Sequence, residues 1–129
     1  MALFDISLPP TIANALNLPG KSPERQQIKV LRKLLNKARF TEFGQAFHFD
    51  EIHLSKNPYE TYRKRVPLFD YNGIYKDWWH KTLEGIPDVC WPGKIKYFAL
   101  SSGTSEASSK YIPITNDLMR GNRMIMIKQ

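Results

Sequence analysis

The hydroxyl-rich segment between residues 96 and 115 carries the residue types best suited to chemistry in this chain. It reads KYFALSSGTSEASSKYIPIT, so an apolar stretch leads into hydroxyl side chains around a glycine and then reaches a lysine. Glycine adopts positive φ without strain and lets the backbone approach an anion closely. Hydroxyl and ammonium groups supply hydrogen-bond donors. The pattern predicts a phosphate-binding loop of Ser101, Ser102, Gly103, Thr104 and Ser105, with Lys110 adding a mobile positive charge.

Two common nucleotide-binding motifs do not match this loop. A Walker A loop requires the order GxxxxGK[ST], whereas Lys110 follows Gly103 by seven positions and is preceded by Ser109. A dinucleotide-binding loop has further glycines and opens a helix, whereas this segment leads into β-favouring residues. A polar hairpin turn whose hydroxyls bond their own backbone explains the loop residues equally well.

Three helices are predicted before the loop. The first starts at a Ser22 cap with Pro23 in its first turn, carries an apolar stripe and ends between Phe40 and Gly44. A second, short helix follows an Asn57 cap and stops before Pro67, and a third follows an Asp70 cap and ends at Gly85. We expect the core to contain the stripe and the aromatic residues that follow it: Ile28, Leu31, Leu35, Ala38, Phe40, Phe43, Phe47 and Phe49.

Two strands and a last helix complete the expected architecture. Residues 95–100 and 111–114 favour β-structure, and Thr115 or Asn116 is placed to cap a helix from Asp117 onward. The fold class is therefore α+β, with a mainly helical region over residues 1–93, a β-hairpin over 94–115 and a helix over 116–129. That final helix is strongly apolar, which indicates a fragment of a larger protein or a homo-oligomer that buries it.

Length and composition predict one folded unit. The chain has 129 residues, of which 42% are hydrophobic. The single cysteine, Cys90, lies between apolar residues, so we expect it in the core and expect no disulfide. The amino terminus lacks the basic start of a signal peptide and no run is long enough to span a membrane, so a cytoplasmic location is the default. The spacing of His48 and His53 matches no common metal site, and no metal site is assigned to protein side chains.

The net charge of +7 comes mainly from the first predicted helix. Residues 21–39 contain seven Lys or Arg residues and one Glu, which gives +6. Such a helix can bind nucleic acid, but a solvated basic face is commoner, and stacking aromatics are not interleaved with these basic residues. A small nucleic-acid-binding module and a non-catalytic assembly fragment are the alternatives to a phosphate-binding function.

Three segments in order resemble a known family. SSGTSEASSK, between KYFAL and YIPIT, resembles the phosphate-binding motif of the GH3 (auxin-responsive promoter) family of acyl acid amido synthetases, which are adenylate-forming ligases. Upstream, ARFTEFGQAFHFDEI and YRKRVPLFDY are similar to family segments at comparable spacing. The resemblance covers most of the chain. Family members are several times longer, so it implies the front portion of a larger adenylation domain.

The resemblance also implies a reaction. A carboxylate attacks the α-phosphate of ATP to give an acyl-adenylate and pyrophosphate, and the amine of an amino acid then displaces AMP to form an amide. In that scheme the hydroxyls of Ser101, Ser102, Thr104 and Ser105, with the amides around Gly103, bind the β- and γ-phosphates of ATP. Lys110 neutralises developing charge, and magnesium accompanies the ATP. Where many relatives have glycines, this chain has Glu106 and Ala107, and we expect the carboxylate to point outward. This short chain alone is expected to bind nucleotide weakly and to lack turnover.

Overall fold

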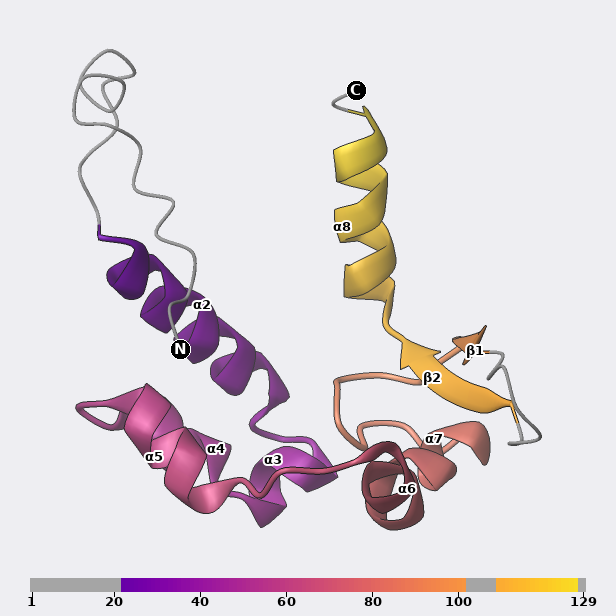
Figure 1. The fold of residues 1–129 in the computed structure, drawn as a ribbon, viewed down its shortest axis with the longest axis horizontal. Coiled ribbons are helices and arrows are strands. Elements are labelled where there is room, and N and C mark those ends of the chain that lie inside the picture. The colour runs from indigo at the N-terminus through magenta and orange to yellow at the C-terminus, as the bar shows by residue number, and fades with distance from the viewer. Residues whose placement is uncertain (1–21, 102–108, 128–129) are drawn as a thin grey trace.

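The computed structural model describes residues 22–101 and 109–127, with side chains of the last helix described as far as Gly121. The elements in chain order are α2 (Pro23–Ala38), α3 (Glu42–Ala46), α4 (Phe49–Leu54), α5 (Pro58–Arg65), α6 (Tyr71–Ile74), the π-helical turn η1 (Tyr75–Trp79), α7 (His80–Leu83), β1 (Tyr97–Ser101), β2 (Lys110–Ile114) and α8 (Asn116–Ile127) (Figure 1). Helices and one antiparallel pair of strands confirm the α+β class.

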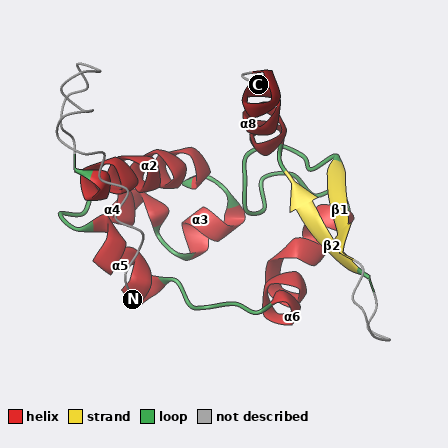
Figure 2. Ribbon diagram, turned by 45° about the horizontal axis from the view of Figure 1, so that its top comes forward, coloured by secondary structure: helices red, strands yellow, loops and turns green. Residues whose placement is uncertain are grey.

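The elements form two neighbouring groups. Helix α2 lies along α4 and α5, while α6, η1 and α7 lie beside the β-hairpin (Figures 1 and 2). Helix α8 leaves the end of β2 and projects away from the hairpin (Figure 2). None of the described helices is both long and apolar enough to cross a membrane.

The start of α2 follows the prediction. The Ser22 hydroxyl accepts a hydrogen bond of 3.3 Å from the Arg25 amide, and Pro23 occupies the first helical position. The helix ends at Ala38, slightly earlier than predicted. There the buried Thr41 hydroxyl donates to the Ala38 carbonyl at 2.6 Å and accepts from the Gly44 amide at 3.0 Å. Thr41 thus closes one helix and caps the next, α3.

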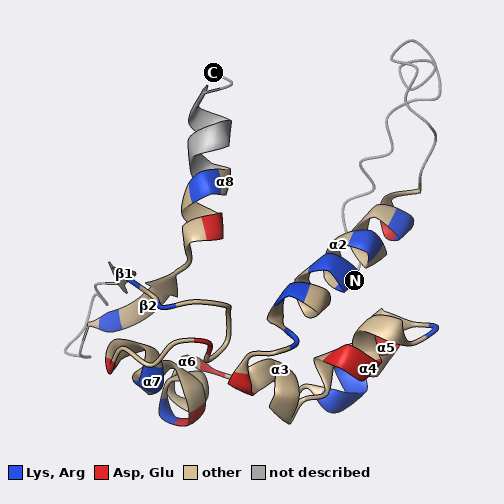
Figure 3. Cartoon of the chain, turned by 180° about the vertical axis from the view of Figure 1, so that it is seen from behind, with Lys and Arg blue, Asp and Glu red and all other residues tan. Residues whose placement is uncertain are grey.

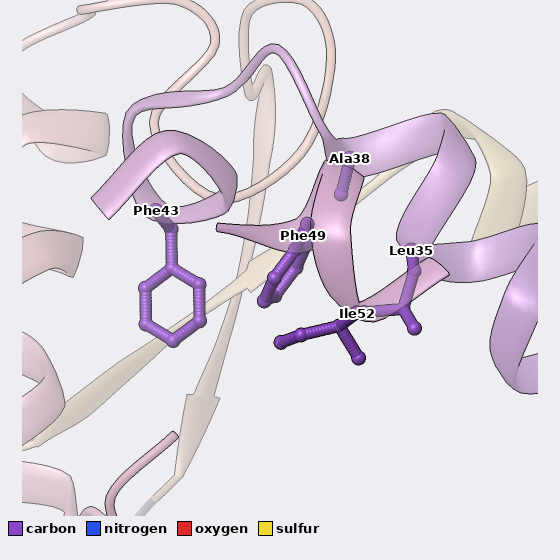
Figure 4. Packing of buried hydrophobic residues seen from close by; sticks show 5 residues of the cluster. All are labelled: Leu35, Ala38, Phe43, Phe49 and Ile52. Atoms are coloured by element: carbon purple, nitrogen blue, oxygen red, sulfur yellow. The ribbon is translucent and has the colours of Figure 1, made fainter. Parts of the chain in front are cut away.

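The core lies where α2, α3 and α4 meet. Its buried members are Leu35 and Ala38 from α2, Phe43 from α3, and Phe49 and Ile52 from α4 (Figure 4). The prediction that Phe40 joins them is wrong, because its side chain is 73% exposed and lies against the Arg39 guanidinium in the turn after α2. Phe47 is half-buried at the edge of the cluster.

One of the basic residues of α2 has a structural role. The Arg32 guanidinium donates to the backbone carbonyls of His53 and, at 3.0 Å, of Ser55. These carbonyls lie at the end of α4, where helix carbonyls lack partners within the helix. Lys and Arg otherwise recur along the outside of α2 (Figure 3). Part of the basic character of this helix therefore serves packing within the chain.

The second and third predicted helices are present, and their caps are confirmed. The Asn57 side chain accepts from the Glu60 amide at 3.3 Å, and the Asp70 side chain accepts from the Gly73 amide at 2.7 Å. The third helix is interrupted by the π-helical turn η1, which the periodicity of its sequence did not reveal. Gly85 then ends the run with a φ of +84°.

The two strands form an antiparallel hairpin. Tyr97 pairs with Ile114, and the pairing continues to Ser101 opposite Lys110. Strand β1 starts two residues later than predicted, at Tyr97, and β2 starts one residue earlier than predicted, at Lys110. The Thr115 hydroxyl accepts from the Leu118 amide at 3.1 Å, which makes Thr115 the cap of α8.

Candidate functional site

The hairpin brings the two ends of the predicted phosphate loop together. Ser101, the last residue of β1, is paired across the ladder with Lys110, the first residue of β2. Both side chains are exposed. Ser102, Gly103, Thr104 and Ser105 lie outside the described residues, as does Glu106. The structure thus places the first hydroxyl of the predicted site and its lysine at adjacent positions.

Lys110 lies over an aromatic ring that the sequence analysis did not single out. Its ammonium nitrogen is 5.3 Å from the centroid of the Tyr71 ring, within the range of a cation–π contact. Within the described part of the chain, no carboxylate pairs with Lys110.

The hydroxyl of Tyr71 also binds the backbone of β2. It accepts a hydrogen bond of 2.9 Å from the amide of Tyr111 and donates one of 3.1 Å to the carbonyl of the same residue. A phenol has one donor and can accept at the same time, so both bonds form together. Tyr71 and Tyr111 are 40 residues apart, and no local pattern links them. Only the Asp70 cap next to Tyr71 indicated that this position has a defined orientation.

Tyr71 is itself held by its neighbours. Its ring stacks on Tyr75 with a centroid distance of 5.8 Å and meets Trp79 edge-on at 6.1 Å. Asp70 caps the short helix in which Tyr71 is the first residue. A side chain at Gly73 would press on the capping carboxylate of Asp70. The helical run from α6 to η1 therefore forms a platform under the start of β2.

Two cavities adjoin the other end of the hairpin. An apolar cavity of about 160 Å³ is lined by residues that include Trp79, Cys90 and Pro113. A more polar cavity of about 320 Å³ is lined by the start of α8 and by Lys94 and Lys96. Neither is lined by Ser101 or Lys110.

Cys90 is half-buried and unsuited to nucleophilic chemistry. Burial raises the pKa of its thiol to about 12, with a further rise from the negative charge of Glu42 and an opposing effect of Lys81. A thiol with this pKa is almost entirely protonated at neutral pH.

No group of three potential metal-binding side chains occurs among the residues that the structure describes. His48 lies at the start of α4 with a left-handed backbone, and His53 lies near the end of the same helix. The described part of the hairpin contains no carboxylate. That magnesium arrives with ATP stays a prediction.

The comparisons with known proteins identify the family. No curated protein and no solved structure shows significant similarity to the chain. A family model described as the GH3 family N-terminal domain matches residues 13–128, which include all the described helices and the hairpin. The match spans most of the chain, as the three resembling segments predicted, and the protein therefore belongs to the GH3 family.

Proposed function

We propose that the β1–β2 hairpin and its loop bind the phosphates of ATP as part of an acyl acid amido synthetase. ATP supplies the activated α-phosphate to which a carboxylic acid is joined, and an amino acid is the second substrate. In this role the residues from Ser101 to Ser105 surround the β- and γ-phosphates, and Lys110 offsets their charge.

The observation that carries the proposal is the cross-strand pair of Ser101 and Lys110 in a chain of the GH3 family. A hydroxyl and an ammonium group at adjacent positions can donate to the same phosphate. Charge-assisted hydrogen bonds of this kind are stronger than neutral ones. The site needs no acid, base or nucleophile from the protein, because both nucleophiles are substrates and the protein contributes positioning and charge.

Nucleic-acid binding by α2 has weaker support. Arg32 is bonded to the end of α4, and Lys37 pairs with Asp117 at 2.6 Å, so two of the cations of α2 already have partners within the chain. A steep dependence of nucleic-acid affinity on salt concentration would favour this alternative.

The test is titration of the chain with MgATP. Binding is monitored by calorimetry and by changes in the amide resonances of β1 and β2. We expect weak binding by the unaltered chain and affinity lower by about tenfold or more in Lys110→Ala, as for loss of a hydrogen bond to a charged group. Lys64→Ala is the matched control, because Lys64 is an exposed lysine on α5.

Equal losses of ATP affinity in both lysine variants would show that ATP binding depends only on net charge. Absence of ATP binding by the unaltered chain would contradict the proposal. In a longer parent enzyme, Lys110→Ala should also lower the exchange of pyrophosphate into ATP in the presence of the acid. Unchanged exchange would exclude the role given to Lys110.

A further inference from the structure

We infer that Tyr71 is a positioning residue for the phosphate site, which it serves by fixing the start of β2 and the side chain of Lys110. This inference rests on the proposed function of the hairpin. Tyr71 lies in a separate part of the sequence, and nothing in its local pattern indicates a role in phosphate binding. Its contacts with two successive residues of β2 carry the argument.

The first contact fixes the backbone. In an antiparallel ladder, successive residues turn their amide and carbonyl groups alternately toward the partner strand and away from it. Tyr111 is paired with Leu100, and both of its backbone polar groups bond the Tyr71 hydroxyl instead of that strand. The outer edge of β2 is thus held at the residue immediately after Lys110.

The second contact restricts the side chain of Lys110. A lysine at the end of an exposed hairpin has several rotatable bonds, and ordering it on phosphate costs conformational entropy. The Tyr71 ring attracts the ammonium group at 5.3 Å and reduces that freedom before the ligand arrives. Preorganisation of this kind raises affinity by lowering the cost of binding.

The two contacts come from different parts of one side chain, so they can be separated by mutation. Tyr71→Phe removes the hydroxyl and keeps the ring under Lys110. Tyr71→Leu removes both. Tyr75→Phe is the matched control, since Tyr75 stacks on Tyr71 and the same hydroxyl is deleted one helical turn away.

Three measurements on the whole chain distinguish these variants. We expect amide exchange of Tyr111 to be faster by about fivefold or more in Tyr71→Phe, as for loss of one hydrogen bond, and unchanged in Tyr75→Phe. We expect the ring-current shift of the Lys110 side-chain protons to persist in Tyr71→Phe and to vanish in Tyr71→Leu. ATP affinity should fall by about threefold in Tyr71→Phe and further in Tyr71→Leu, because hydrogen bonds and cation–π contacts have modest net energies.

The outcomes separate this inference from the proposed function. If the unaltered chain fails to bind ATP, the proposed function is overturned, while amide exchange and the Lys110 shift still decide whether Tyr71 positions the lysine. If the chain binds ATP and Tyr71→Phe behaves like Tyr75→Phe in both exchange and affinity, the inference is overturned. Tyr71→Phe retains the ring and its packing, so it answers the question even if Tyr71→Leu does not fold.

Discussion

The indole nitrogen of Trp91 donates a hydrogen bond of 3.0 Å to the carboxylate of Asp117. The two residues join the turn that precedes the hairpin to the first turn of α8. The same carboxylate oxygen receives the ammonium group of Lys37, from the end of α2, at 2.6 Å. Asp117 is therefore the point at which the helical region holds the start of α8.

This junction should respond to acid. Hydrogen bonds from Lys37 and Trp91 lower the pKa of Asp117 below its ordinary value, against a smaller opposing effect of desolvation. A lowered pKa in the folded state stabilises the fold above the ordinary pKa of about 4, and that contribution is lost as the pH falls through the lowered pKa. We predict that Asp117→Asn weakens the acid dependence of stability, measured by urea unfolding between neutral pH and about pH 3. Asp77→Asn is the control and should show the same acid dependence of stability as the unaltered chain. If both variants weaken that dependence, this explanation is excluded.

The core should be far more sensitive to truncation than the surface of the same helix. Ile52 is 0% exposed and Leu54 is 80% exposed, and both belong to α4. Ile52→Ala should lower the free energy of unfolding by about 3 kcal/mol, because it removes buried methyl groups and leaves a cavity. Leu54→Ala should change it by less than about 0.5 kcal/mol. Urea unfolding of both variants is the measurement, and similar losses would place the core elsewhere.

Helix α3 should accept only glycine at position 44, where it packs closely against the end of α2. A methyl group there would overlap the carbonyl oxygen of Ala38, which already accepts the Thr41 hydroxyl. Gly44→Ala should therefore lower stability by about 3 kcal/mol, as for severe overpacking. In α8, by contrast, a methyl group at Gly121 meets nothing within 4 Å. Gly121→Ala should raise stability by up to about 1 kcal/mol through helix propensity. In thermal unfolding, the melting temperature should fall in Gly44→Ala and rise in Gly121→Ala. These opposite shifts would support both assignments, and an unchanged melting temperature in Gly44→Ala would contradict the first.

Cys90 should be nearly inert toward alkylation in the folded protein. Burial, reinforced by Glu42, raises its thiol pKa to about 12, so little thiolate exists at pH 8. We predict that iodoacetamide modifies Cys90 much more slowly in buffer than in urea, as followed by mass spectrometry. The rate in buffer should increase as the pH is raised toward the thiol pKa. Equal rates in buffer and urea would show that the thiol is accessible and ionised.

The starts of the helices could be predicted from the sequence because each capping side chain lies close in sequence to the amide that it binds. Ser22, Asn57 and Asp70 each cap an amide three residues ahead, and such contacts are visible as a local pattern. The π-helical turn was not predicted, and its Trp78 packs against Phe43, which lies 35 residues earlier, at a ring distance of 5.0 Å. The exposure of Phe40 was missed for a related reason. The position of Phe40 after the end of α2, and not its hydrophobicity, determines its exposure.

The candidate site was predictable only in part. The residue types from Ser101 to Lys110 predict a phosphate loop, and the paired strands bring the two ends of this segment together. Tyr71 could not be found in this way, because the hydroxyl that binds Tyr111 acts across 40 residues. Such a contact exists only once the helical run from α6 to η1 lies against the hairpin. A single sequence contains no local signal for it.

The contact between Tyr71 and Tyr111 also occupies part of the outer edge of the small sheet. At Tyr111 the outer edge of β2 has no free amide or carbonyl to offer another strand, because one phenol occupies both. An exposed strand edge is otherwise a template for pairing with another chain. A further strand could pair with β2 at Tyr111 only by displacing the Tyr71 hydroxyl. The side chain that contacts the lysine end of the loop therefore also protects part of an exposed strand edge.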